Sequence, residues 1–334
     1  MKEILEGIFL VDSLAFGEGG LTACYLIKEG DEYLIIDPGF PGSDRAIWER
    51  LKDKGISPGM VKAIILTHFH IDHSGACGAM LAENPEMRVY VHKRSAYYVK
   101  NFGKIIGGAR MVFRTALSKG FSEAVPVAAE RVFAVEDGDY VEIGGRRLKV
   151  IHSPGHSPDN ICVYDEKTGA IFTGDLSCLQ YPALNRVYIP AGSPPLFELN
   201  TEIDSLKNLG RYDITEILTP HFGPTGLKRD EYIEKSINAI VETRSRIKEM
   251  FKEGLEFQHM VERLRGEVIK ASGKKEDEIP IFIRDVYLRE MLKTGLMGFL
   301  AFLLEYAPYP RGFGNYDQEI RINSPYYETA ELVI

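Results

Sequence analysis

The sequence contains little that would tie it to a membrane or to an oxidising compartment. Its 334 residues include only four cysteines, which are widely scattered and show no paired metal-ligand spacing, so we expect reduced thiols in a cytoplasmic protein. The longest apolar run, residues 296–304, is too short to cross a bilayer. Residues 1–6 carry two glutamates and lack the apolar stretch of a signal peptide. These absences predict a cytoplasmic protein that does not span a membrane.

The sequence also lacks an excess of basic residues. Its formal net charge is -8 at pH 7 and its pI is about 5.6, which argues against a nucleic-acid-binding surface. A hydrophobic content of 45% and a charged content of 26% are those of an ordinary globular protein. We therefore expect a small-molecule substrate, with neither a nucleic acid nor a membrane as partner.

Histidine is scarce, yet it is concentrated in one stretch. Of the eight histidines in the chain, three lie at positions 68, 70 and 73, with Asp72 among them. This stretch follows residues 61–66, a short apolar segment that predicts a buried strand. Because side chains alternate along an extended chain, His68, His70 and Asp72 can point the same way. Imidazoles and a carboxylate in one turn are ligands suited to a first-row divalent metal.

The remaining pattern predicts helices packed on sheets. We expect strands at residues 6–14, 21–36, 61–66, 88–92, from about 132, 146–151, 160–164, 170–173 and 214–219. We expect helices at residues 43–54 (capped by Ser43), 76–83, 201–209, 229–252, 257–271 and 283–306. Residues 93–129 are irregular and helical, typical of an insertion or lid, and residues 178–200 predict a loop. This pattern predicts two domains, a sheet-containing domain at residues 1–228 and a helical region at residues 229–334.

Three later residues also lie in turns directly after predicted strands. His156, Asp175 and His221 each have glycine or proline beside them, as suits turns that aim a side chain. A single histidine or aspartate in a turn is more often structural than metal-binding. Together with the first stretch, however, the three indicate one shared site.

These residues, with Asp37-Pro38-Gly39 and Pro154-Gly155-His156, resemble the metallo-β-lactamase superfamily, whose signature is HxHxDH followed by a distant His, an Asp and a final His. The resemblance covers about residues 6–228. It implies an α+β fold, the αββα metallo-β-lactamase sandwich, here with a helical C-terminal extension. It also implies a two-metal centre along one edge of the sandwich.

The resemblance assigns roles to these residues. It implies that His68, His70 and His156 bind one divalent ion, that Asp72, His73 and His221 bind a second, and that Asp175 bridges them. We expect zinc, with iron or manganese as alternatives. Asp72 would be the catalytic proton carrier, and Asp37 would either orient a ligand or cap its own loop.

We expect a hydrolase in which a metal-bridging hydroxide attacks an ester, thioester or lactone carbonyl of a small molecule. Two alternatives stay open, an RNA or phosphodiester hydrolase and a persulfide dioxygenase-like enzyme with one iron at His68, His156 and Asp175. The chain lacks the segment with which glyoxalase II binds glutathione. It also has Cys178 where related lactonases carry a tyrosine, although Tyr181 or Tyr188 could substitute.

Several other residues allow two interpretations. The apolar helix at 283–306 suggests a homodimer through the C-terminal helices. We expect structural roles for the remaining histidines, His92, His152 and His259, although His152, four residues before His156, could instead donate a hydrogen bond to a ligand. The basic residues of the insertion could bind an anionic substrate or face solvent; they are Arg110, Arg114 and Lys119. Its aromatic residues could line a pocket or pack in the core; they are Phe102, Phe113 and Phe121.

Overall fold

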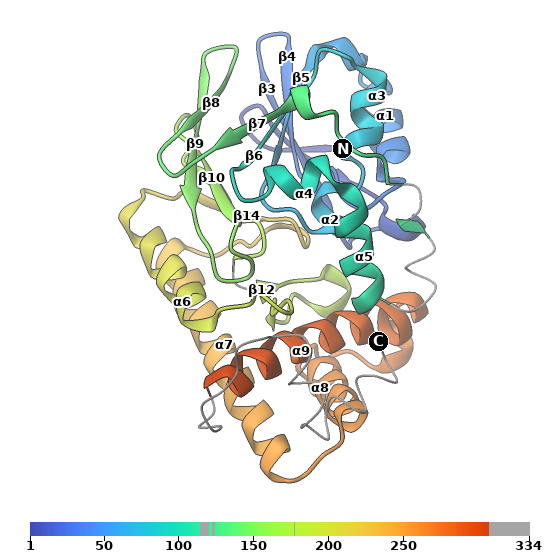
Figure 1. Ribbon diagram of the computed structural model, residues 1–334, viewed down its shortest axis with the longest axis vertical. Helices are drawn as coiled ribbons and strands as arrows, with labels where there is room; N and C mark the ends of the chain where they lie inside the picture. Colours follow the sequence, from blue (N-terminus) through green and yellow to red (C-terminus); the bar gives the residue numbers. More distant parts are fainter. Residues whose placement is uncertain (114–119, 122–123, 177, 307–334) are drawn as a thin grey trace.

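Two sheets lie face to face with helices outside them, and further helices pack against one end (Figure 1). The computed structural model describes residues 1–113, 120–121, 124–176 and 178–306. This arrangement confirms the predicted α+β sandwich with C-terminal helices. No helix among the described residues is both long and apolar enough to cross a membrane.

The first sheet contains seven strands in sequential order. They are β1 (Lys2–Leu5), β2 (Ile8–Asp12), β3 (Ala23–Glu29), β4 (Glu32–Ile36), β5 (Val61–Leu66), β6 (Arg88–His92) and β7 (Val132–Val135). Strands β1 to β4 pair antiparallel, whereas β4 to β7 pair parallel. Parallel strands are buried on both faces, which explains why Ile64, Ile65 and Leu66 form an unbroken apolar run with no exposed side chain.

The second sheet has the order β15-β14-β11-β10-β9-β8. Its strands are β8 (Tyr140–Ile143), β9 (Arg146–His152), β10 (Ile161–Asp165), β11 (Ala170–Phe172), β14 (Glu216–Thr219) and β15 (Gly223–Pro224). All neighbours pair antiparallel except β11 and β14. That parallel pair is joined by a crossover that includes a helix, as parallel neighbours require.

The helices were largely predicted from sequence spacing. They are α1 (Ser43–Lys52), α2 (Ile71–Ser74), α3 (Cys77–Glu83), α4 (Ala96–Lys100), α5 (Phe102–Val112), α6 (Leu199–Asn208), α7 (Arg229–Lys252), α8 (Phe257–Ala271) and α9 (Leu288–Tyr306). A π-helical turn, η8 (Ile283–Tyr287), precedes α9.

Burial of apolar side chains explains the layers. One apolar cluster fills the space between the sheets, where the rings of Tyr25 and Phe172 lie 5.1 Å apart. A second cluster joins the first sheet to α1 and α3. A third joins the second sheet to α5 to α9 and also contains Phe40 and Ile71. The C-terminal helices therefore share a core with the sandwich, and the domain boundary at 228 stays a prediction.

The structure corrects three details. Ser43 is not the cap of α1, because Gly42, with φ 88, occupies that position and Ser43 is the first helical residue. Residues 178–200 are not all loop, since β12 (Cys178–Leu179) pairs with β13 (Ile189–Pro190). Strands β1 and β15 were not predicted as separate elements. In the insertion, Arg114 and Lys119 lie outside the described residues.

Candidate metal centre

The side chains that the sequence marks as metal ligands lie on loops at one end of the two sheets. The loop after β5 carries His68 and His70, and the short helix α2 that follows carries Asp72 and His73. The loops after β9, β11 and β14 carry His156, Asp175 and His221. They form two groups, in each of which the ligand atoms lie within 4.8 Å of one another. One group is His68, His70 and His156, and the other is Asp72, His73, Asp175 and His221.

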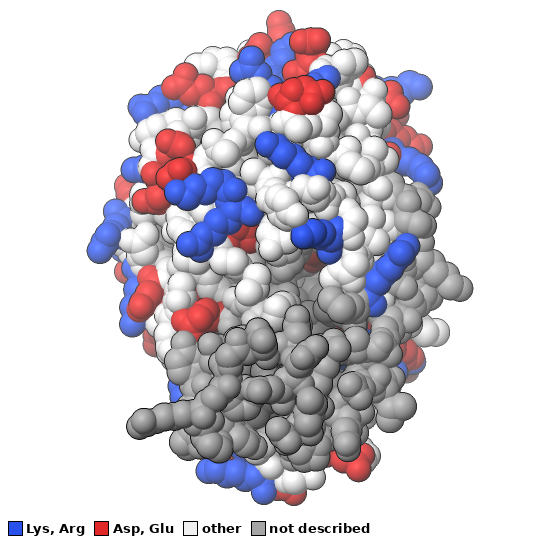
Figure 2. Space-filling view, viewed as in Figure 1, with Lys and Arg blue, Asp and Glu red and all other residues white. Residues whose placement is uncertain are grey.

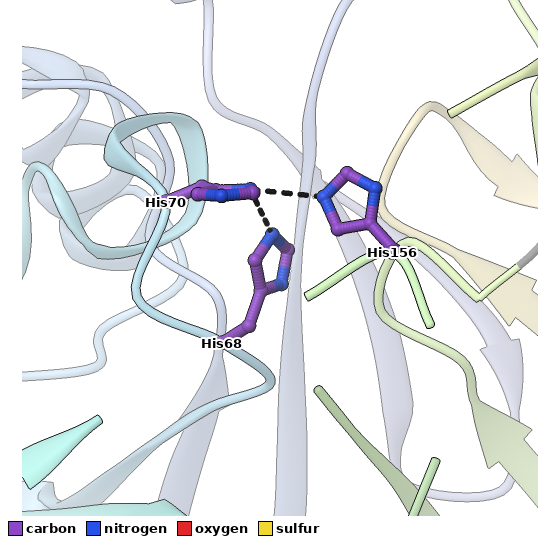
Figure 3. A group of neighbouring side chains, drawn as sticks. All are labelled: His68, His70 and His156. Atoms are coloured by element: carbon purple, nitrogen blue, oxygen red, sulfur yellow. Dashed lines mark hydrogen bonds between the residues drawn. The ribbon is translucent and has the colours of Figure 1, made fainter. Parts of the chain in front are cut away.

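The first group consists of three imidazole rings that face one another (Figure 3). Nδ1 of His70 lies 3.0 Å from Nε2 of His68 and 2.9 Å from Nε2 of His156. Burial, with the neighbouring histidines, lowers the pKa of His68 and lowers that of His70 to about 3. These two rings are therefore neutral, which is the form that binds a metal.

Hydrogen bonds on the far side of two of these rings determine where their protons lie. Oγ1 of Thr67 donates to Asp37 at 2.6 Å, so it accepts from Nδ1 of His68 at 3.1 Å. Nδ1 of His156 donates to the carbonyl of Ala191. Nε2 of both rings then carries a bare lone pair aimed at Nδ1 of His70. A proton on Nδ1 of His70 can be donated to only one of these lone pairs at a time, whereas a cation among the three nitrogen atoms would interact with both.

The second group mixes imidazoles with carboxylates. Nε2 of His73 lies 3.5 Å from Asp72 and 3.4 Å from Asp175, and Nε2 of His221 lies 3.4 Å from Asp72. Within the described part of the chain, Nε2 of both histidines and Oδ1 of Asp175 are buried without a hydrogen-bond partner of good geometry. Buried polar atoms are seldom left unpaired in this way, so three of them together indicate a site that binds a ligand.

The charges of the second group are strongly coupled. Burial disfavours the charged form of each member, but the nearby carboxylates raise the pKa of His73 well above its usual value and raise that of His221 to about 9. The histidines in turn lower the pKa of Asp175 despite its burial. The carboxylates thus favour positive charge on these histidines, and a divalent cation among them would supply that charge instead.

Asp175 faces both groups. Its Oδ2 lies 3.4 Å from Nε2 of His156, and its Oδ1 lies 3.3 Å from Nε2 of His221. A tetrahedral zinc ion with nitrogen ligands at about 2.0–2.1 Å would hold neighbouring donors roughly 3.3 Å apart. The nitrogen and oxygen donors thus fit two divalent ions in type, number and spacing.

Asp37 holds one ligand in place from behind. Its carboxylate accepts hydrogen bonds from Nδ1 of His73 at 2.9 Å and from the backbone N–H of Thr67 at 2.8 Å. These bonds support the first interpretation of Asp37, because they orient a candidate ligand and reach the segment after β5; capping of its own loop stays a prediction. Fixing the Nδ1 proton leaves Nε2 of His73 to face the site.

Sequence reasoning missed two residues that shape the ligand loops. Asp159 accepts from the backbone N–H of Phe69 at 2.9 Å, and Oδ1 of Asn160 accepts from the N–H of Asp175 at 3.2 Å. Gly174, with φ 54, permits this approach, because a Cβ there would lie 2.4 Å from Oδ1 of Asn160. The only sequence signal was their place in a turn after His156.

The other residues singled out lie apart from the ligands or pack beside them. His92 and His152 stack with centroids 4.3 Å apart, and His152 bonds the carbonyl of Pro158, whereas His259 is exposed. Arg110 is exposed. Cys178 and Tyr181 are buried in the core. The aromatic residues of the insertion are also buried there; they are Phe102, Phe113 and Phe121.

Comparisons with known proteins agree with this geometry. A family model described as the metallo-beta-lactamase superfamily matches residues 17–221. An uncharacterized protein of Aquifex aeolicus is 30% identical over 204 residues, 57% of this chain and 83% of that one. Acyl-coenzyme A thioesterase MBLAC2 of Bos taurus is 25% identical over 259 residues, 70% of this chain and 87% of that one. An archaeal metallo-beta-lactamase superfamily protein of Sulfolobus tokodaii matches in structure with a TM-score of 0.62 at 20% identity, covering 88% of this chain and 98% of that one.

Proposed function

The chain belongs to the metallo-β-lactamase superfamily, and we propose that it is a metal-dependent hydrolase that cleaves the acyl thioester of a small molecule. The observation that carries this proposal is the convergence of the two groups of candidate ligand atoms, in the second of which Nε2 of both histidines and Oδ1 of Asp175 are buried without a hydrogen-bond partner of good geometry among the described residues. The thioester class is proposed because MBLAC2, which this chain matches over 87% of its length, is named an acyl-coenzyme A thioesterase.

The residues divide the chemical work. Bound divalent ions would supply a hydroxide at neutral pH and polarise the acyl carbonyl. His68, His70 and His156 hold one position, and the group containing Asp175 holds the other. Asp72 is the residue that we assign to carry a proton to the leaving group. Its side chain is 12% exposed, against 5% for Asp175, so it is the carboxylate of the site with more access to an incoming substrate.

Zinc is the ion that we propose for both positions, since imidazole and carboxylate ligands without a thiolate suit a borderline divalent cation. The same donor set also accepts iron or manganese. The net charge of -8 and the mixture of basic and acidic side chains on the face shown in Figure 2 favour a small substrate over a nucleic acid. A homodimer through the C-terminal helices is a further proposal, which sedimentation would test.

The test combines metal analysis with a substrate panel. We expect two zinc ions per chain and hydrolysis of acyl-coenzyme A esters, with chelation abolishing the activity and added zinc restoring it. Preferred turnover of a lactone or of bis(p-nitrophenyl) phosphate would overturn the thioester assignment. One iron per chain together with oxygen consumption on a persulfide would replace the hydrolase by a dioxygenase.

A further inference from the structure

A cavity lies among the C-terminal helices, apart from the candidate metal ligands. Residues of α7, α8, α9 and the strand β13 line it, and these helices lie at the lower end of the molecule in Figure 1. Its volume is about 250 Å³. Protein interiors contain few voids larger than a water molecule, so a space of this size is not ordinary packing.

The inner wall of this cavity is apolar. Ile247 of α7 is fully buried, and Leu296 and Phe299 of α9 are each 1% exposed. The strand β13 contributes Ile189 and Pro190, which are also buried. Cavities with walls of this kind stay dry, and one of about 150 Å³ in another protein binds benzene. The inner wall therefore favours a hydrocarbon ligand.

The rim of the cavity is polar and open to solvent. Glu242 and Arg246 of α7 line it and are exposed, and Thr243 between them is half-buried. Arg246 is the only cation among the described lining residues, and it already forms an ion pair with Glu267 of α8. With that guanidinium paired and Glu242 adding a negative charge, the rim disfavours an anionic head group. The hydroxyl and carboxylate groups can instead form hydrogen bonds with an uncharged one.

The end of β13 separates the cavity from the candidate metal centre. Pro190 lines the cavity, whereas the carbonyl of the next residue, Ala191, accepts from Nδ1 of His156. Gly192 then packs tightly on α9, because a Cβ there would lie 2.9 Å from the carbonyl oxygen of Gly295. None of the candidate metal ligands is among the described residues that line the cavity. A molecule bound in it would therefore be a ligand separate from the one at the metal centre.

The volume of the cavity limits the length of a chain that it can hold. A methylene group takes about as much space as a water molecule in the liquid, about 30 Å³. A cavity of about 250 Å³ therefore accommodates about eight carbon atoms. A chain of this length buries its carbon atoms against the inner wall while its polar end stays at the rim.

We propose that this cavity binds an amphiphile with a linear hydrocarbon chain of about eight carbon atoms and an uncharged head group, as in a fatty alcohol. The chain contacts Ile247, Leu296 and Phe299, and the head group lies at the rim beside Thr243. The inference goes beyond the proposed hydrolase function and does not depend on it, because binding here requires neither a metal ion nor turnover.

Calorimetric titration of the full-length protein with straight-chain alcohols tests this proposal. We expect one binding site per chain and an affinity that rises about fourfold per methylene group from 1-hexanol to 1-octanol. The affinity should rise no further from 1-octanol to 1-decanol, because the cavity is then full. Octanoate at pH 8 presents a carboxylate on a chain of the same length, and it should bind about tenfold more weakly than 1-octanol.

Two substitutions fill the cavity from different helices. Val268→Phe adds a ring from α8 and Ala239→Phe adds one from α7, since both residues line the cavity. Each should weaken the binding of 1-octanol about tenfold or more, and the second variant keeps the test valid if the first does not fold. Val241→Phe is the matched control, because Val241 of α7 is 42% exposed and does not line the cavity. Its affinity should stay within about twofold of the wild-type value.

Several outcomes would overturn the proposal. The first is the absence of a saturable site for 1-octanol in the wild type. The second is an unchanged affinity in Val268→Phe and Ala239→Phe, since the alcohol would then bind elsewhere. An equal loss of affinity in Val241→Phe would also assign the site to the helix surface. Octanoate that binds as tightly as 1-octanol would overturn the choice of an uncharged head group.

Discussion

Two polar clusters are buried at opposite ends of strands β3 and β10, and they differ in how well the chain itself satisfies them. At one end, Arg146 makes two hydrogen bonds to Asp165, at 2.9 and 2.6 Å, and also donates to the carbonyls of Glu6 and Lys28. At the other end, the second ligand group leaves buried nitrogen and oxygen atoms without a hydrogen-bond partner of good geometry in the part of the chain that the structure describes. The comparison shows that burial of charge alone does not mark a site. The marker is burial of charge that the chain leaves unpaired.

The largest expected effect is on the unpaired cluster. Asp175→Ala should lower kcat more than about 1000-fold, because both ligand groups lose the carboxylate that faces them. Its metal content should fall, as measured by elemental analysis, while circular dichroism remains that of a folded protein. Retained turnover would refute the bridging role of Asp175.

Substitution in the cluster of Arg146 and Asp165 should lower stability and leave activity unchanged. Arg146→Met leaves Asp165 buried without its partner, so unfolding by denaturant should show a loss of about 3–5 kcal/mol. Turnover per folded molecule should be unchanged.

Arg147→Met is the control next in sequence. The side chain of Arg147 is 48% exposed and pairs with exposed carboxylates, so we expect a loss below about 1 kcal/mol. Equal losses of stability in Arg146→Met and Arg147→Met would show that the buried ion pair stabilises the protein no more than an exposed one does.

A smaller effect tests how the C-terminal helices support the unpaired end. A Cβ on Gly298 of α9 would lie 2.8 Å from backbone atoms of Gly192 and Ser193. That loop also carries the Ala191 carbonyl that accepts from His156. Gly298→Ala should therefore cost about 1–3 kcal/mol and reduce metal content.

Gly266→Ala, in α8, is the matched control for Gly298→Ala. No atom lies within 4 Å of a Cβ placed there, so this substitution should stabilise the helix by up to about 1 kcal/mol. Normal metal content in Gly298→Ala would show that α9 does not influence the ligands.

The smallest expected effect is on the pH dependence of stability, through His92, which is not one of the candidate ligands. Burial, with the stacked His152 and the nearby Arg94 and Lys93, lowers the pKa of His92 to about 4. In the unfolded chain, His92 takes up a proton near pH 6.5, whereas in the folded protein it stays neutral until about pH 4. The stability that depends on neutral His92 is therefore complete above pH 6.5 and is lost as the pH falls toward 4. His92→Phe should reduce the acid-induced loss of stability by about 1–2 kcal/mol.

His259→Gln serves as the reference for that experiment, since His259 is exposed. Its stability should follow the wild-type pH profile. Chemical unfolding of the metal-free proteins at pH 7.5 and pH 4.5 measures both variants, and parallel profiles for His92→Phe and the wild type would contradict the prediction.

The sequence was sufficient to predict elements that depend on local residue spacing and residues that lie in a short chemical motif. The strand β5, the helices α7 and α8, and the convergence of His68 and His70 follow from periodicity and alternation. The role of Asp159 could not be predicted, because it depends on a contact with the backbone of Phe69, 90 residues away in the chain. Such contacts arise from packing, which leaves no periodic signal.

The distribution of the ligand loops along the chain has a consequence for biosynthesis. Each ligand group combines a histidine from the loop after β5 with residues that follow at least 80 positions later in the chain, and the second group ends at His221. A nascent polypeptide still on the ribosome therefore cannot complete the second group before residue 221 has emerged. If metal binds as we propose, the second position would be filled only late in synthesis, after the segment that carries His221 has joined the segment after β5.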